Sequence, residues 1–142
     1  MNENKKANRL IKKGSLILLC ALYIGAGINH FWHPKTYIAI IPPYFPNAKF
    51  INIASGILEI IAGILVISPY TRKLGTYLII ILLIVFIPAH IYLIQMKGCI
   101  SQYLCTTELF AWIRLFPFQF LLMWWAWKTY KWNLKPYGRA GL

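Results

Sequence analysis

The sequence has 142 residues, with 15 Lys and Arg against 3 Asp and Glu and a formal net charge of +12. Hydrophobic residues make up 59% of the chain and charged residues 13%, whereas a soluble domain has about 45–50% apolar and about 25% charged residues. This composition excludes an ordinary soluble protein, and the length fits one domain, residues 1–142.

Four apolar stretches follow one another along the chain, at residues 14–31, 50–68, 74–96 and 107–127. Each is near the roughly 20 residues with which an α-helix crosses a hydrocarbon core of about 30 Å. The expected fold class is all-α: an integral membrane four-helix bundle of antiparallel transmembrane helices. The first stretch also has the basic start and small residues of a cleavable signal peptide, but its apolar pattern continues to Phe31, which favours a retained span.

The basic residues predict the orientation, because Lys and Arg beside spans are retained on the cytoplasmic side. Most of them flank span one's start, the turn after span two, or span four's end: Lys5, Lys6, Arg9, Lys12, Lys13, Arg72, Lys73, Lys128, Lys131, Lys135 and Arg139. The opposite ends carry Lys35, Lys49 and Lys97. We therefore expect a multi-pass protein of a bacterial-type cytoplasmic (inner) membrane, with both termini cytoplasmic. The net positive charge is then explained by the orientation of the spans in the membrane. The expected partner is the lipid bilayer, not nucleic acid.

Two extracytoplasmic connections are expected. The first, residues 34–49, has four prolines that break any long helix and enough apolar side chains to lie in the interface as a lid. The second holds Cys99 and Cys105, which in an oxidising compartment form either a disulfide, the favoured interpretation, or two free thiols.

Four ionisable side chains fall inside the spans, where each costs about 2.5–3.5 kcal/mol at mid-bilayer and therefore needs a partner or a role. They are His30, Glu59, His90 and Arg114. Counted at 1.5 Å per residue, His30 lies at the outer rim and the other three about 10–14 Å deep. All four share the outer half, which predicts one converging site.

Further polar residues surround these four. Asn52 and Ser55 share a helical face with Glu59, Asn29 precedes His30, and Gln119, about a turn and a half past Arg114, is expected to line the floor of a pocket. Pro88 and Pro117 are expected to kink spans three and four, and kinked helices in membranes often surround cavities. The sequence thus predicts a polar pocket that opens outward beneath the Pro-rich loop.

Two other interpretations of these residues exist. We expect Glu59 and Arg114 to lie close enough to interact, with His30 and His90 within one hydrogen-bonded step, and this buried ion pair can also serve only to fix helix packing. A metal site using His30, Glu59 and His90 is disfavoured because the histidines differ in depth, so no metal is predicted. No catalytic residue is assigned, and whether the chain is an enzyme is left open.

The order and spacing of short motifs resemble the DoxX-like family of small four-span membrane proteins. The matching features are Asn29-His30-Phe31 with Pro34 and Tyr37, Ile41-Pro42, Ser55-Gly56-Ile57-Leu58-Glu59 with Gly63, Thr71-Arg72, Phe86-Ile87-Pro88-Ala89, and Arg114-Leu115 with Pro117 and Gln119. One departure is His90, where the family pattern more often has Asn.

The resemblance implies two functions. One is an accessory or membrane-anchor subunit of a quinone-linked oxidoreductase, whose pocket takes a quinone-like or lipid-like molecule and whose partner is a membrane or extracytoplasmic oxidoreductase. The alternative is a chaperone-like assembly factor for membrane proteins, in which the buried polar cluster is structural. The sequence contains no redox cofactor motif of its own, and quinone is the cofactor that the first function implies.

Overall fold

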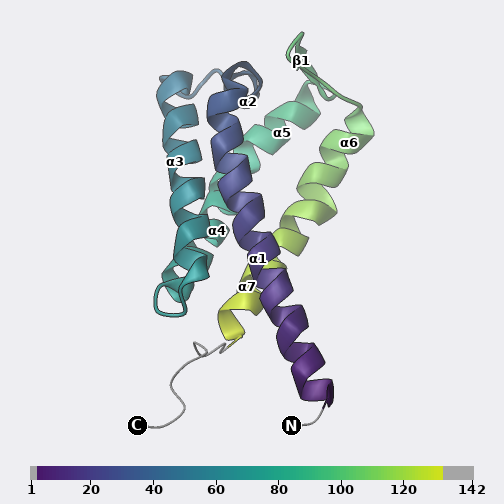
Figure 1. Ribbon diagram of the computed structural model, residues 1–142. Coiled ribbons are helices and arrows are strands. Elements are labelled where there is room, and N and C mark those ends of the chain that lie inside the picture. Colours follow the sequence, from purple (N-terminus) through teal and green to yellow (C-terminus); the bar gives the residue numbers. More distant parts are fainter. Residues whose placement is uncertain (1–2, 133–142) are drawn as a thin grey trace.

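The computed structural model describes residues 3–132, so Lys135 and Arg139 of the orientation argument lie outside the described residues. Helices dominate the chain in the order α1 (Glu3–Trp32), α2 (Pro34–Ile40), α3 (Ala48–Ile67), α4 (Arg72–Val85) and α5 (Ile87–Gln95), as Figure 1 shows. A hairpin of β1 (Cys99–Ser101) and β2 (Leu104–Cys105) follows, and then α6 (Glu108–Ile113), the π-helix η1 (Arg114–Gln119) and α7 (Phe120–Lys131).

The prediction of four membrane-spanning segments is confirmed at the level of helix length and composition. Within the described residues, four helical segments are long and apolar enough to cross a membrane: Glu3–Trp32, Ala48–Ile67, Arg72–Gln95 and Glu108–Lys131. The first begins at Glu3 and not at residue 14, because the intervening Lys, Arg, Asn and Ala residues contain no helix breaker and include strong helix formers. The small antiparallel hairpin is an addition to the expected all-α class.

Side-chain caps fix where two of the spans begin. Asn47 adopts a left-handed conformation with φ of 53°, and its side chain accepts a hydrogen bond from the backbone N–H of Phe50. Thr107 likewise accepts from the N–H of Phe110 at the start of α6. These side-chain oxygens accept hydrogen bonds from backbone N–H groups that lack a partner inside the helix, so α3 and α6 begin at defined positions.

Two glycines bring α1 and α3 into close contact. A Cβ atom added to Gly27 would lie 2.6 Å from the carbonyl oxygen of Gly56, and one added to Gly56 would lie 2.8 Å from Cβ of His30. Small residues permit such an approach between membrane helices, where packing and not the hydrophobic effect drives association. The contact places His30 directly beside α3.

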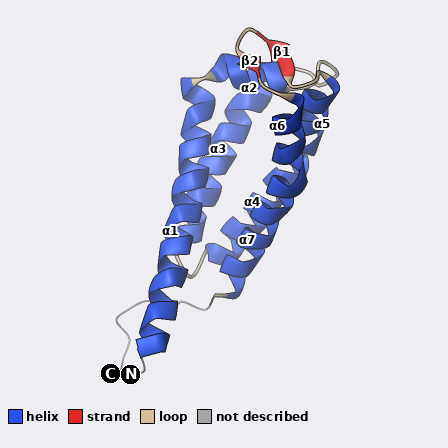
Figure 2. Ribbon diagram, turned by 90° about the vertical axis from the view of Figure 1, so that its right-hand side faces the viewer, coloured by secondary structure: helices blue, strands red, loops and turns tan. Residues whose placement is uncertain are grey.

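The helices run alternately between two ends of the molecule (Figures 1 and 2). At the terminal end, where α1 begins and α7 ends, the chain forms a packed core whose members include Leu19, Ala62, Val66 and Ile79. Towards the hairpin end, where α2 and the β-hairpin lie, the third span breaks at Phe86 and α5 restarts with Pro88 in its first turn. Up to this break α4 packs against α3, whereas beyond it α5 packs against α2, α6 and η1. The break therefore separates the walls of the bundle at the hairpin end.

The fourth span also departs from regular α-helix. Phe116 has φ of −137° and ψ of 116°, which is extended backbone inside η1, and Pro117 follows it. Both kinks expected from Pro88 and Pro117 are thus present. The backbone carbonyl of Leu83, close to the α4–α5 break, accepts a hydrogen bond from Nε2 of Gln119, as a freed carbonyl requires in a membrane.

The hairpin holds α2 across the hairpin end of the bundle. Cys99 and Cys105 form a disulfide that closes the hairpin. At its tip, the backbone oxygen of Tyr103 accepts a hydrogen bond of 3.2 Å from Oγ1 of Thr36. Nζ of Lys35 donates to the Tyr103 hydroxyl at 3.4 Å and also lies 4.8 Å from the centre of its ring.

Candidate functional site

A cavity of about 340 Å³ lies between the separated walls at the hairpin end. Its volume is at the lower end of the roughly 300–1,000 Å³ that small-molecule pockets occupy. The first two spans, α2 and its loop, both sides of the α4–α5 break, and η1 all contribute to its lining: Ala26, His30, Tyr37, Ile40, Ile41, Pro42, Phe45, Ile51, Asn52, Ser55, Glu59, Val85, Phe86, Pro88, Ala89, His90 and Arg114. Six of the eight sequence-predicted site residues are therefore in one place.

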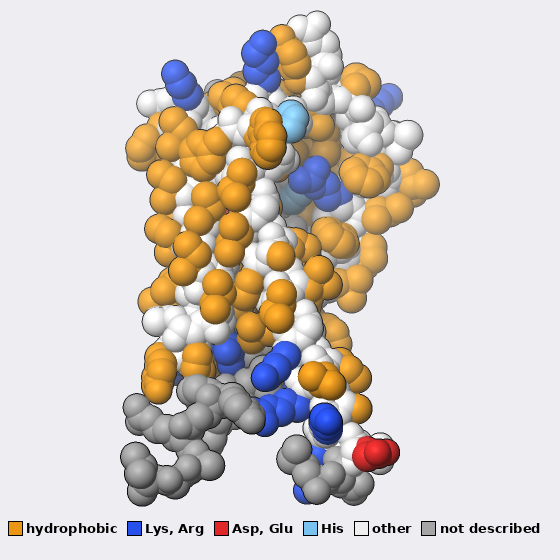
Figure 3. Space-filling view, viewed as in Figure 1, with side chains coloured by type: hydrophobic (Ala, Val, Ile, Leu, Met, Phe, Trp, Pro, Cys, Tyr) orange, Lys and Arg blue, Asp and Glu red, His pale blue; other side chains and the backbone are white. Residues whose placement is uncertain are grey.

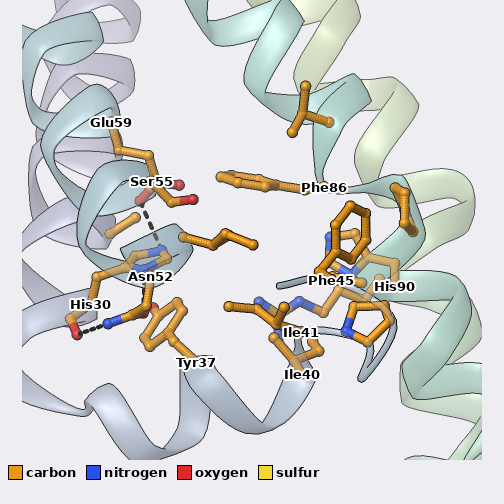
Figure 4. A pocket seen from close by; sticks show the side chains of 17 residues that line it. His30, Tyr37, Ile40, Ile41, Phe45, Asn52, Ser55, Glu59, Phe86 and His90 are labelled. Atoms are coloured by element: carbon orange, nitrogen blue, oxygen red, sulfur yellow. Dashed lines mark hydrogen bonds and ion pairs between the residues drawn. The ribbon is translucent and has the colours of Figure 1, made fainter. Parts of the chain in front are cut away.

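A buried polar cluster forms the wall made by α1 and α3 (Figure 4). Nδ1 of His30 lies 2.8 Å from Oδ1 of Asn52, and Nδ2 of Asn52 donates to the backbone oxygen of His30 at 3.1 Å. Nε2 of His30 lies 3.3 Å from Oε2 of Glu59. Both members of this ion pair are buried, with exposed fractions of 7% for His30 and 6% for Glu59.

These contacts determine where the protons of the cluster reside. Because Asn52 uses its amide nitrogen as the donor to the His30 backbone, its Oδ1 is the acceptor, and Nδ1 of His30 must carry a proton. Nε2 then faces the carboxylate of Glu59, and two acceptors repel each other unless a proton lies on one of them. The contact is an ion pair when His30 carries a proton on both ring nitrogens, and the total charge of that pair is zero.

His90 and Arg114 lie on the opposite wall. His90 is 8% exposed, and its Nδ1 has no hydrogen-bond partner among the described residues. Arg114 also lines the cavity, from η1, which packs against the helix α5 that carries His90. Figure 4 shows His90 across the cavity from Glu59 and Ser55, with Phe86 projecting between the two sides. The cavity therefore has two polar walls and an apolar interior.

The expectation that Glu59 pairs with Arg114 is wrong. Both residues line the cavity, but the ion pair that Glu59 forms among the described residues is with His30. The physical reason is the geometry of the helices. The Gly27–Gly56 contact draws α1 onto α3, while the break before α5 carries the Arg114 side of the bundle away from α3.

Two predicted pocket residues do not line the cavity. Asn29 lies outside the lining, where its Nδ2 donates to the Tyr37 hydroxyl at 2.9 Å and its Oδ1 is 2.8 Å from Nδ1 of His33. Gln119 was expected at the pocket floor but is turned to the carbonyl of Leu83. The helix break leaves the Leu83 carbonyl without a backbone donor, and no water is present inside a membrane to hydrogen-bond it. The side-chain amide of Gln119 therefore donates to this carbonyl and not into the pocket.

Tyr37 lines the cavity and is named in the sequence analysis only as part of a family motif, whereas Tyr23, which the sequence did not single out, belongs to the packed core. The ring of Tyr37, in α2, lies 3.8 Å from that of His30 between centroids and covers it from the hairpin end. Tyr23 is 3% exposed, and its hydroxyl has no partner among the described residues. Tyr23, Gly27 and His30 recur at helical spacing, which is the signal that places all three on the α1 face against α3.

No group of three His, Cys, Asp or Glu side chains suited to a metal ion is present in the part of the chain that the structure describes. Cys20 is buried and free, and it belongs to the packed core at the terminal end. The polar side chains that line the cavity are capable of proton exchange at His30 and Glu59 and of hydrogen bonding at His90 and Arg114.

A family model described as a domain of unknown function (DUF8561) matches residues 19–130. The match contains every residue that lines the cavity. No curated protein and no solved structure matches the chain.

Proposed function

The chain belongs to the DUF8561 family, and we propose that its cavity binds a small amphipathic molecule, quinone-like or lipid-like, within the membrane. In this proposal the protein is an accessory or membrane-anchor subunit of a quinone-linked oxidoreductase, and the electrons are carried by a partner. The link to an oxidoreductase is based on the resemblance to the DoxX-like family, whereas the binding of an amphiphile is based on the cavity itself.

The proposal includes an arrangement in the bilayer. The four spans form an antiparallel bundle in a bacterial-type cytoplasmic membrane, with the terminal end in the cytoplasm and α2 and the β-hairpin outside. The lysines and arginines that begin α1 and α4 and end α7 support this orientation. Large apolar side chains such as Ile17, Ile64, Ile81 and Trp124 are exposed along all four spans, as contact with lipid requires.

One observation carries the proposal: buried polar groups from separate helices converge on a cavity whose remaining surface is apolar. A structural ion pair alone needs no cavity, and a packed core would fill one. Ile40, Ile41 and Phe86 provide apolar contacts, while the two polar walls provide hydrogen bonds at opposite sides. Ligand sites have this combination of a largely apolar lining and a few polar groups.

The residues fit the head of a quinone. The aromatic and aliphatic side chains between the walls are suited to a flat ring, and each wall offers a hydrogen-bond donor to a carbonyl oxygen, Ser55 on one side and Arg114 on the other. A quinone would supply the capacity to accept electrons and protons. The protein's own contribution is the proton held between His30 and Glu59 at the cavity wall, in a site that Tyr37 covers.

The second candidate is a non-enzymatic, chaperone-like assembly factor for membrane proteins. The observation in its favour is that the contacts of His30, Asn52 and Glu59 with one another all join α1 to α3. Such a network can exist to fix helix packing, with the exposed apolar faces as the working surface.

Mass spectrometry of small molecules retained after purification in mild detergent tests ligand binding. Ala26 lines the cavity, so Ala26→Phe should displace the ligand by filling the space, whereas Ala21→Phe, at an exposed position on the same helix, should retain it. A retained quinone or lipid that disappears only in Ala26→Phe supports the proposal. Identical extracts from all three proteins would favour the assembly factor.

A further inference from the structure

Arg114 has no partner for its charge within the described part of the chain. It takes part in no hydrogen bond through its side chain and no ion pair there, although it lies within the fourth span and lines the cavity. Arginine inside a membrane span is costly, and such residues are almost always paired or turned towards a polar cavity. The missing counter-charge must come from outside these residues.

The other charges of the cavity do not neutralise Arg114. Glu59 is the one acidic residue of the lining, and its ion-pair partner is His30, 3.3 Å away. The cavity as a whole therefore carries a net positive charge, which is located on the guanidinium of Arg114. In surroundings of low dielectric constant, that charge strongly favours an anion over a neutral group.

The positive wall can be reached from the side of the molecule. Figure 3 shows a hollow on the face between α1 and α6, with a basic side chain and a histidine inside it. Arg114 lines the cavity and is also partly exposed, which is consistent with a position at this opening. α1 packs mainly on α3, and α6 packs on α5 and η1, so no tight interface closes the gap between them. The opening lies on a flank that faces lipid if the spans cross a bilayer.

We infer that the cavity selects an amphiphile with an anionic head, a carboxylate or a phosphate monoester, which the guanidinium of Arg114 binds while the acyl chain leaves between α1 and α6. The inference rests on the proposed binding of an amphiphile and selects its lipid-like alternative, because a neutral quinone carries no counter-charge for Arg114. Arg114 offers paired N–H donors that match both kinds of oxyanion. His90 Nδ1, buried and without a hydrogen-bond partner among residues 3–132, is the second group that faces the head.

The test compares anionic probes with neutral probes of the same chain. The full-length protein in mild detergent is incubated with oleate or methyl oleate, and with dioleoyl phosphatidic acid or dioleoylglycerol, and the bound fraction is measured by native mass spectrometry. The wild type should prefer at least one anionic probe over its neutral match by about tenfold, as expected for charge-assisted hydrogen bonds. Preference for oleate identifies a carboxylate head, and preference for phosphatidic acid identifies a phosphate.

Three variants assign the preference to Arg114. Arg114→Gln should bind the anionic and neutral probes equally, and Arg114→Lys should keep part of the discrimination and show that the site still folds. Lys49→Gln removes a positive charge at an exposed position outside the cavity and should behave like the wild type.

Two results would overturn the inference, and they differ in what they say of the proposed function. If the wild type binds charged and neutral probes equally, or if Arg114→Gln keeps the preference, the cavity binds amphiphiles without selecting charge, and the proposed function stands. If no probe binds and no small molecule is retained from the membrane, the inference and the proposed function fail together.

Discussion

Oε2 of Glu59 on α3 lies 3.3 Å from Nε2 of His30 on α1, and both side chains are buried. This pair, not one between Glu59 and Arg114, neutralises the acidic residue of the cavity. It also joins the two helices that the Gly27–Gly56 contact brings together. The stability of the bundle and the charge of its cavity therefore depend on the same two residues.

The first prediction concerns this pair. His30→Leu or Glu59→Leu alone leaves one buried polar group without its partner and should destabilise the protein by about 3–5 kcal/mol, whereas the double variant should cost clearly less than the sum. Melting temperatures of the three variants in detergent give the comparison. The matched cycle of Glu59→Leu with Arg114→Leu should be additive, because no ion pair joins these residues. Strong coupling in that second cycle would contradict the structure.

The second prediction uses two glycines of one helix. A Cβ at Gly27 would lie 2.6 Å from the Gly56 carbonyl oxygen and 2.9 Å from the backbone nitrogen of Ile60, whereas no atom lies within 4 Å of a Cβ at Gly25. Gly27→Ala should therefore push α1 from α3 and cost about 1–3 kcal/mol. Gly25→Ala should be neutral or stabilise by up to about 1 kcal/mol, because alanine favours the helix. Equal melting temperatures for the two variants would show that α1 and α3 are not in this contact.

The third prediction concerns Arg72 at the terminal end of the bundle. Its Nε donates to the carbonyl of Val66 at 3.1 Å, and its terminal nitrogens donate to Ile67 at 3.3 Å and Trp132 at 3.4 Å. Arg72 thus satisfies carbonyls at the end of α3 and connects that end to the residue after α7. Arg72→Met should lower stability by about 1–3 kcal/mol, because it leaves these acceptors without a donor.

The control for Arg72 is its neighbour Lys73, which is exposed and makes only a distant contact with the Tyr130 ring. Lys73→Met removes the same charge and should leave the melting temperature nearly unchanged. If both variants were equally unstable, the cost would come from the loss of positive charge at this end and not from the hydrogen bonds of Arg72.

The fourth prediction concerns the contact between the β-hairpin and α2. The disulfide closes the hairpin whose tip, Tyr103, accepts the hydrogen bond from Thr36. Cys99→Ser with Cys105→Ser should loosen the tip and make the amides of α2 exchange with solvent about two- to tenfold faster, as the loss of one hydrogen bond implies. Hydrogen exchange with mass spectrometry measures this, and the peptides of α3 serve as the internal reference. Unchanged exchange in α2 would mean that the hairpin does not hold it.

The fifth prediction is the orientation in the membrane. Lys49→Cys places a thiol at the hairpin end, and Lys73→Cys places one at the terminal end. An impermeant maleimide added to intact cells should label the first and not the second. The native cysteines interfere little, because Cys20 is buried and the other two are bonded. Labelling of Lys73→Cys alone would reverse the orientation and place the cavity in the inner half of the bilayer.

The sequence by itself determined the four long apolar helices and the end of the bundle at which the polar residues gather. Length and hydropathy are sufficient for the spans, because a helix must satisfy its own backbone in lipid and its rise per residue is constant. Counting residues from the span ends was sufficient to place His30, Glu59, His90 and Arg114 in the same half of the bundle. The kinks were also predictable, since Pro88 and Pro117 cannot donate backbone hydrogen bonds.

Only the tertiary structure decided which of these residues meet. Depth along a helix says nothing about which neighbour a side chain faces or how far apart two helices lie. The glycine contact selected His30 as the partner of Glu59, and the break before α5 left Arg114 across the cavity. The freed carbonyl of Leu83 turned Gln119 away from the pocket floor. In each case the outcome depends on the distance between two helices, which is a property of their packing and not of either segment alone.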